Sequence, residues 1–189
     1  MIFMRYKDEI KRHKIKDAVV SVVLKNGFHG ASVSKIAKEA GVSPATIYIY
    51  FENKYQMFQS VYIEYTQDFY NYIFENLNTA EYGEEIVEKL ILSLYSYIKE
   101  NELVFRFIDQ YKNCPALSLD CSGVNGVTKI MNLIFELEES GIIKKINTKN
   151  VYTIIFGPIK TLALNFRTDS ETEKMLDELI VLIKEMLLM

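Results

Sequence analysis

The sequence is poor in several residue types on which other classes of protein depend. It has no tryptophan, two cysteines, two histidines, three prolines and eight glycines in 189 residues. Two histidines offer little acid–base chemistry near neutral pH. We find no nucleophile motif, no metal-ligand spacing and no glycine-rich phosphate loop. We therefore expect neither an enzyme nor a metal site, and no bound cofactor.

Long apolar runs are absent too. No run reaches the roughly 18 residues that a membrane-spanning helix needs. The N-terminal stretch MIFMRYKDEIKRHK becomes charged before the apolar core of a signal peptide could form. Because 49% of the residues are hydrophobic, a folded core is expected rather than disorder. We expect a cytoplasmic protein without a membrane span.

The two cysteines, Cys114 and Cys121, lie on either side of Pro115. They could form a disulfide or supply half of a metal site. Neither His13 nor His29 stands at a recognisable ligand spacing from them. Free thiols beside a loop are the favoured interpretation for a cytoplasmic protein.

Charge is divided unevenly along the chain. Residues 1–54 contain ten Lys/Arg and five Asp/Glu, whereas residues 55–189 contain twelve and twenty. A basic N-terminal part on an acidic remainder is typical of a protein whose N-terminal part meets a polyanion. A chance fluctuation in charge would give the same numbers.

Apolar residues recur at spacings of three and four along almost the whole chain, which predicts an all-α protein. A first amphipathic helix, ended by Asn26–Gly27, carries an apolar stripe of Ile10, Ile15, Ala18, Val19, Val22 and Val23. Shorter helices follow Ser32 and Ser43. Longer ones are expected near residues 53–78, 84–99, 102–112, 124–140, 148–167 and 171–188.

The segment GFHGASVSKIAKEAGVSPATIYIYFENK, residues 27–54, predicts a tight bend between two helices. Ser32 is a natural N-cap, and Gly41 can adopt the positive φ of a sharp helix exit. Ser43 and Pro44 then suit the cap and first position of the next helix. If Ile47 and Phe51 turn inward to meet Ile36 and Ala40, the result is a helix-turn-helix.

The opposite face of this second short helix has the side chains that a DNA groove can receive. Hydroxyls donate to phosphates, lysine neutralises them, and small or apolar side chains contact base edges and thymine methyls. Free N–H groups at the preceding helix's N-terminus would face a phosphate as well. The candidate DNA-binding residues are Ser32, Ser34, Lys35, Ser43, Ala45, Thr46, Tyr48, Ile49, Tyr50 and Lys54. The alternative for the tyrosines is packing against the following long helix.

These residues closely resemble the DNA-binding signature of TetR-family transcriptional regulators. Matching positions include Gly27, Phe28, Ser32, Ile36, Ala37, Ala40, Gly41, Val42, Ser43, Ile47, Tyr48, Tyr50, Phe51 and Lys54. The resemblance implies that Thr46 reads a base and that Ser43, Tyr48, Tyr50 and Lys54 hold phosphates. It covers about residues 8–58. Because Pro44, Ala45 and Ile49 depart from the family pattern toward apolar contact, we hypothesise an operator with thymines under Ile49 and Ala45.

The resemblance also implies a division into a helix-turn-helix domain, residues 1–54, and a helical ligand-binding and dimerisation domain, residues 55–189. The expected function is a ligand-responsive transcriptional regulator, a repressor released from a palindromic double-stranded DNA operator by a small, partly apolar or aromatic effector. The last two helices, rich in apolar residues, are expected to pair with a second copy through Ile155, Gly157, Ile159, Leu162, Phe166, Leu176, Ile180 and Ile183. The alternative is that these stripes face only the protomer's own core.

Aromatic residues are dense in the middle of the chain, which suits a flat or apolar ligand. The candidate ligand-binding residues are Tyr65, Phe69, Tyr72, Phe105, Gln110, Tyr111, Tyr152 and Phe156. Aromatic stripes at helical spacing are also typical of a packed core, so both interpretations stand.

Two further alternatives concern the basic segment. The chain could be an interaction protein that has lost DNA binding, although Thr46, Tyr48, Tyr50 and Lys54 are all in place. It could also be a membrane-surface protein that uses its basic first helix. The cluster in question is Lys7, Lys11, Arg12, Lys14 and Lys16. The same charges would serve equally well beside phosphates.

Overall fold

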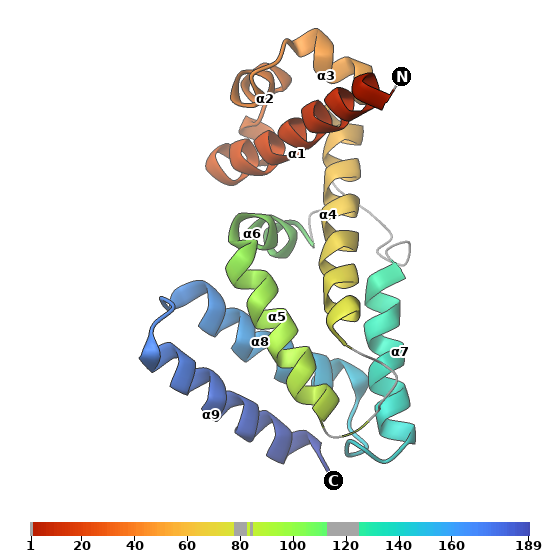
Figure 1. Ribbon diagram of the computed structural model, residues 1–189, viewed down its shortest axis with the longest axis vertical. Coiled ribbons are helices and arrows are strands. Elements are labelled where there is room, and N and C mark those ends of the chain that lie inside the picture. Colours follow the sequence, from red (N-terminus) through yellow and green to blue (C-terminus); the bar gives the residue numbers. More distant parts are fainter. Residues whose placement is uncertain (1, 78–82, 84, 113–124) are drawn as a thin grey trace. The chain divides into compact units, whose positions relative to one another are not determined.

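The computed structural model describes residues 2–77, 83, 85–112 and 125–189. They form nine α-helices (Figure 1), and their only β-pairing is a bridge between Ile143 and Leu188. The all-α expectation is confirmed. None of these helices is long and apolar enough to cross a membrane. Cys114, Pro115 and Cys121 lie outside the described residues, so the expectation of free thiols stays a prediction.

The chain forms two compact units. The first takes in Met1–Thr66 and Leu103–Asp120, and the second takes in Gln67–Glu102 and Cys121–Met189. The long helix α4 (Lys54–Asn76) therefore belongs to both units, and the boundary passes through it after Thr66.

The first unit contains α1 (Ile2–Gly30), α2 (Val33–Ala40), α3 (Pro44–Tyr50), the start of α4 and most of α6 (Glu102–Tyr111). Helix α1 breaks at Gly27, whose φ of 70° and ψ of 168° are not helical. The break stands where Asn26–Gly27 predicted a helix end, and one further turn continues to Gly30. Without a Cβ, glycine adopts this positive φ at little cost.

The core of the first unit is built from the inward stripes of α1, α2, α3 and α4. Side chains that are essentially fully enclosed include Ile15, Val19, Val23, Ile36, Ile47 and Phe58. The expectation that Ile10 shares this stripe is wrong, because its side chain is 40% exposed. None of residues 8–14 is buried, so from residue 8 onward the buried face of α1 begins at Ile15.

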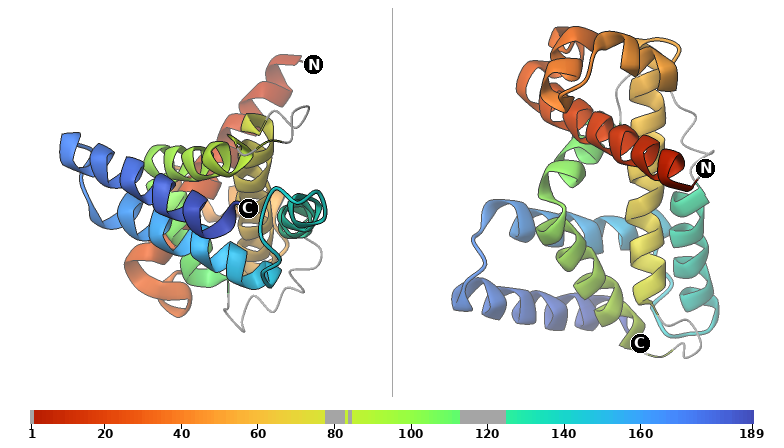
Figure 2. Two further views of the ribbon diagram at one scale, coloured as in Figure 1. Left: turned by 90° about the horizontal axis from the view of Figure 1, so that it is seen from below. Right: turned by 45° about the horizontal axis from the view of Figure 1, so that its top comes forward.

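The second unit contains the rest of α4 together with α5 (Glu85–Glu100), α7 (Asn125–Glu139), α8 (Thr148–Asn165) and α9 (Ser170–Leu187). Helix α8 packs against α5, α7 and α9, and α5 also contacts α9 (Figure 2). Gly141, at φ 72°, ends the turn after α7. Asn147 caps α8 by accepting from the Lys149 N–H at 3.0 Å, and Asp169 caps α9 by accepting from the Thr172 N–H at 2.9 Å. The predicted helices agree with the observed ones to within a few residues.

The C-terminal end of α9 is held by the connection between α7 and α8. The Lys144 N–H donates to the Leu187 carbonyl at 2.7 Å. Its ammonium Nζ donates to the carbonyls of Glu185, at 2.9 Å, and Met186, at 3.3 Å. The last carbonyls of a helix lack partners within it and carry partial negative charge, so this cation stabilises the end of α9.

Gly126, near the start of α7, is buried where a side chain has no room. A Cβ built on it would fall on the first atoms of the Tyr70 side chain. We therefore expect Gly126→Ala to lower the free energy of unfolding by at least about 1 kcal/mol, since overpacking outweighs alanine's better helix propensity. Urea denaturation measures the effect. Thr128→Ala, at an exposed position of the same helix, is the control and should not lower stability. An unchanged urea midpoint for Gly126→Ala would contradict the packing described.

Candidate functional site

The bend between α2 and α3 is fixed by backbone hydrogen bonds. Gly41 adopts a left-handed conformation, with φ 67°. Its N–H donates to the Lys38 carbonyl at 3.2 Å, and the Val42 N–H donates to the Ala37 carbonyl at 2.9 Å. This pair of bonds satisfies carbonyls at the end of α2. The left-handed glycine predicted at this position is confirmed.

Helix α3 begins as the sequence indicated. The Ser43 Oγ accepts a hydrogen bond from the Thr46 N–H at 3.2 Å, so Ser43 is the N-cap, and Pro44 occupies the first helical position. Ser32 caps α2 in the same way, since its Oγ accepts from the Lys35 N–H at 3.3 Å. Each short helix thus has a donor at its N-terminus satisfied by a side chain.

The inward face of α3 is small, and its side chains are buried. Ile47 and Phe51 are buried, and so are Ile36, Ala37 and Ala40 on α2. The two helices lie in contact. The predicted helix-turn-helix packing is therefore confirmed, and it leaves the other residues of α3 turned away from this core.

The outward face of α3 is open to solvent. Ile49 is 78% exposed and Tyr48 is 55% exposed. Ala45 and Ser43 are also exposed, and Thr46 is half-buried. The hydroxyls of Ser43 and Thr46 lie 2.9 Å apart and share a hydrogen bond. Ser43, Thr46 and Tyr48 thus bring three hydroxyls to this face, beside the aliphatic side chains of Ala45 and Ile49.

Tyr50 is half-buried at the end of α3, and its hydroxyl donates to the Asp8 carboxylate at 3.3 Å. Burial, and then the charge of Asp8, raise the pKa of Tyr50 above its ordinary value. The sequence did not point to Asp8, which lies 42 residues away and outside the short motif. Tyr50 therefore already has a partner within the protein.

The two candidate lysines contact the end of α1. The Lys54 ammonium donates to the Phe28 carbonyl at 2.8 Å. The Lys35 ammonium donates to the Gly30 carbonyl at 2.9 Å and to the Asn26 side chain at 3.1 Å. Ser34, the remaining predicted residue of this group, is exposed on α2.

Part of the basic cluster on α1 is engaged with α4 rather than with solvent. Arg12 and Lys16 both form ion pairs with Glu64, and the Lys16 residue is only 8% exposed. Lys16 also lies over the ring of Tyr65, whose hydroxyl donates to Asp17 at 2.6 Å. Two members of the cluster, Arg12 and Lys16, are therefore already paired within the protein, as the buried cation of Lys16 requires. Lys11 and Lys14 are exposed.

The eight candidate ligand-binding residues are divided between the two units. Tyr65, Phe105, Gln110 and Tyr111 belong to the first, and Phe69, Tyr72, Tyr152 and Phe156 belong to the second. In the second unit the Tyr152 and Phe156 rings stack at 4.1 Å, and Phe156 meets Phe69 at 6.5 Å between ring centroids. In the first unit the Gln110 amide donates to the Tyr111 hydroxyl at 3.5 Å.

Tyr97 on α5 joins the aromatic group of the second unit and was not among the candidates. Its ring lies 4.9 Å from that of Phe69 and 5.2 Å from that of Tyr72, centroid to centroid. Burial, and then the charge of Asp68, raise the pKa of Tyr97 well above its ordinary value. This tyrosine therefore stays protonated and neutral in the folded protein. In the sequence, only its position within the apolar stripe of α5 could have indicated that Tyr97 belongs to this aromatic group.

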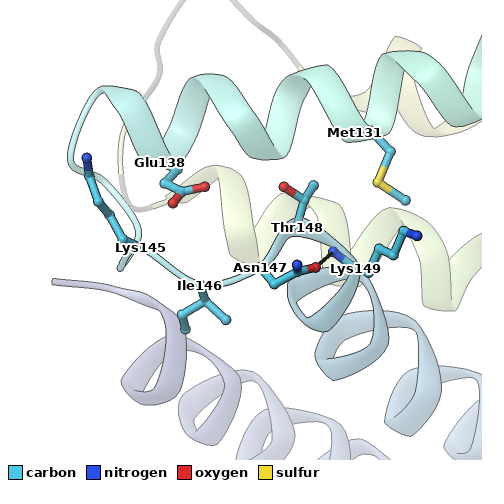
Figure 3. Close-up of a pocket in the computed structure, with 7 residues that line it drawn as sticks. All are labelled: Met131, Glu138, Lys145, Ile146, Asn147, Thr148 and Lys149. Carbon is cyan, nitrogen blue, oxygen red and sulfur yellow. Dashed lines mark hydrogen bonds between the residues drawn. The ribbon is translucent and has the colours of Figure 1, made fainter.

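Two surface pockets of the second unit are lined by other residues. One, of about 480 Å³, lies where α7 leads into α8 (Figure 3), and Lys145, Lys149 and Glu138 are its charged residues. The other, of about 340 Å³, lies along α5 and α9 and is lined by Glu88, Asp177, Ile180, Val181, Lys184 and Glu185. None of the eight candidate ligand-binding residues lines either pocket.

The candidate dimer residues fall into two groups. Gly157 and Phe166 reach the surface. The other six are buried within the protomer: Ile155, Ile159, Leu162, Leu176, Ile180 and Ile183. For these six, the interpretation that part of each stripe faces the protomer's own core agrees with their burial, and their contact with a second copy stays a prediction.

Comparison with known proteins identifies the helix-turn-helix. Residues 15–61 match the family model described as "Bacterial regulatory proteins, tetR family". Among curated proteins, the fatty acid metabolism regulator protein of Bacillus subtilis (strain 168) is 36% identical over 88 residues, or 47% of this chain and 45% of that protein. The chain spans about half the length of the curated relatives it matches.

Solved structures extend the likeness to nearly the whole chain. A TetR family transcription regulator from Marinobacter aquaeolei VT8 superposes with a TM-score of 0.84 at 23% identity, covering 97% of this chain and 98% of that one. The transcriptional regulator FadR from Bacillus subtilis, in complex with stearoyl-CoA, gives a TM-score of 0.65 at 24% identity, covering 90% and 96%. At these identities the likeness shows the fold. Together with the matched helix-turn-helix, it makes the chain similar to TetR-family regulatory proteins in its N-terminal segment and in its fold.

Proposed function

We propose that the protein is a ligand-responsive DNA-binding transcriptional regulator, a cytoplasmic repressor without catalytic activity. Residues 1–54 bind a palindromic operator, and residues 55–189 bind a small, partly apolar or aromatic effector and a second copy of the chain. The observation that carries the proposal is the outward face of α3, where Tyr48 and Ile49 are exposed inside the segment that matches the family.

The DNA contacts divide into positioning and reading. Phosphates accept hydrogen bonds from Ser43 and Tyr48. They also accept from the N-terminal end of α2, with Ser32 and Ser34. Thr46, Ala45 and Ile49 meet the base edges of the major groove. Tyr48 and Ile49 are adjacent and exposed on the same helix as Thr46, so Ile49 is free to contact thymine methyls.

For dimerisation we propose a surface of α8 and α9 that lies beside the buried candidate residues. Next to the buried stripe of α9 runs a second apolar stripe that reaches the surface, made of Met175, Leu179, Leu182 and Met186. Their spacing of four, three and four residues puts them on one face of the helix. Gly157 and Pro158 of the neighbouring α8 are half-exposed. Two copies joined here about a two-fold axis present two α3 helices to a palindrome.

A long-chain acyl-CoA is the effector to test first. The Bacillus subtilis regulator FadR is solved in complex with stearoyl-CoA, and the curated match from the same species is named a fatty acid metabolism regulator protein. An acyl chain is apolar, as the density of aromatic side chains in residues 55–189 favours. The effector acts by population shift: it binds better to the conformation that cannot place both α3 helices in successive major grooves. Helix α4 belongs to both compact units and carries the displacement.

Ile49→Ala and Thr46→Ala should weaken binding to an operator selected from a random duplex library by the purified protein. Each loses contacts with base edges, so we expect about 1–3 kcal/mol, or roughly five- to 150-fold in Kd. Fluorescence anisotropy at several salt concentrations measures it. Leu103→Ala, at another large exposed aliphatic side chain, is the control and should bind as the parent protein does. Selection of a core made only of G·C pairs would contradict the thymine contacts.

Leu182→Glu should convert the dimer to a monomer and weaken operator binding with it. Leu182 is 53% exposed in the protomer, so the change costs the fold little, but it buries two like charges between copies. We expect at least about 3 kcal/mol, more than a hundredfold in the dimer Kd. Sedimentation equilibrium measures it, and Phe135→Glu, at an equally exposed position of α7, is the control. A Leu182→Glu protein as dimeric as the parent would place the interface elsewhere.

Stearoyl-CoA should release the protein from the operator, and saturating operator should weaken stearoyl-CoA binding by the same factor. Linkage requires this symmetry, and about five- to 150-fold is typical of such coupling. Calorimetry with and without operator measures both directions, with free coenzyme A as the control. Tight stearoyl-CoA binding that operator leaves unchanged would contradict the coupling. No stearoyl-CoA binding would contradict only the effector class.

A further inference from the structure

The end of α1 leaves carbonyl groups in need of donors. After the break at Gly27, a last turn runs to Gly30, and the Ala31 N–H closes it by donating to the Gly27 carbonyl at 3.1 Å. Carbonyls in the last turn of a helix have no partner within it and carry the negative end of the helix dipole. We call residues 26–30 the α1 end.

Lys54 supplies one of these donors from the first residue of α4. Its ammonium lies 2.8 Å from the Phe28 carbonyl oxygen, 4.9 Å from the centroid of the Phe28 ring and 5.7 Å from that of Phe58. The two rings pack at 4.8 Å, and Phe58 is fully buried. Burial lowers the pKa of Lys54 below its ordinary value. An exposed lysine awaiting a phosphate would have neither the rings nor the carbonyl around it.

Lys35 supplies a second donor from the first turn of α2. Its ammonium reaches the Gly30 carbonyl at 2.9 Å and the Asn26 side-chain oxygen at 3.1 Å. A cation in the first turn of a helix opposes the helix dipole. Here the side chain turns back to the α1 end, where the negative end of another dipole receives it.

We propose that Lys54 and Lys35 serve operator binding as positioning residues that hold the α1 end, rather than as phosphate contacts. The inference rests on the proposed DNA-binding function. Helices α2 and α3 both lie between residues 31 and 53, and the bond from Lys54 to Phe28 joins the two ends of that segment. Closing the segment at its base fixes the direction in which α3 presents Tyr48 and Ile49. It also ties the start of α4 to the helix-turn-helix, so that both move together.

The two roles for these lysines predict different responses to salt. A lysine on a phosphate releases counterions, and its loss reduces the slope of log Kd against log salt by about 0.9 per phosphate, or about 1.8 for two copies. A lysine that holds the α1 end leaves that slope as it is. Its loss instead frees the backbone of the α1 end in the protein without DNA.

The test uses Lys54→Met and Lys35→Met, which keep the apolar stem and remove the ammonium. Lys38→Met, at an exposed position of α2, is the matched control for the loss of one charge. Amide hydrogen exchange in the free protein reports on the Ala31 N–H, and operator affinity is measured from low to high salt. A hydrogen bond to a charged group stabilises the local fold more than a neutral one does. We therefore expect the exchange rate of the Ala31 N–H to rise about fivefold or more in both lysine variants, because local opening becomes easier. Exchange rates in helices α5–α9 should not change.

We expect both lysine variants to show faster exchange at Ala31 and weaker operator binding. Their slope of log Kd against log salt should equal that of Lys38→Met. A slope reduced by more than in Lys38→Met, unchanged exchange at Ala31, a uniform rise throughout the protein, or unchanged operator affinity would each overturn the proposal. If the parent protein selects no operator, the proposed function fails. The exchange measurement in the free protein still decides whether the lysines hold the α1 end.

Discussion

The presentation of α3 depends on the burial of two side chains, Ile47 and Phe51, against α2. A helix of seven residues is too short to be stable alone in water. It persists because these two residues pack on Ile36 and Ala40, and because its N-terminus is capped by Ser43. Once they are fixed inward, the 3.6-residue period leaves Ala45, Tyr48 and Ile49 no position but the surface. The open face of α3 is thus a geometric result of the small core beneath it.

Local signals in the sequence were sufficient for most of the fold. Ser32, Gly41 and Ser43 act within three or four residues of themselves, so their roles as caps and as the left-handed turn could be predicted directly. The same holds for Gly27. Contacts between distant residues could not be predicted, because helical spacing gives the face on which a side chain lies but not its partner. Asp8 with Tyr50, and Phe28 with Lys54, are of this kind.

The candidate sites show the same limit. The two apolar stripes that contain Ile159, on α8, and Ile180, on α9, are buried in the protomer. The neighbouring stripe with Leu182 reaches the surface instead. A hydrophobic period of 3.6 residues cannot distinguish burial within one chain from burial between two. The aromatic residues of the middle segment share this ambiguity. Tyr97 contacts the rings of the candidates Phe69 and Tyr72, yet helical spacing alone did not distinguish it as a candidate.

The connection between Lys144 and the end of α9 has a consequence for how the second unit opens. Terminal helices commonly fray one turn at a time, because little holds their last residues. Here the final turn of α9 is hydrogen-bonded to Lys144 in the connection between α7 and α8, so the turn cannot open without breaking these bonds. We therefore expect the C-terminal turn and the rim of the pocket around Lys145 to open together as one cooperative unit.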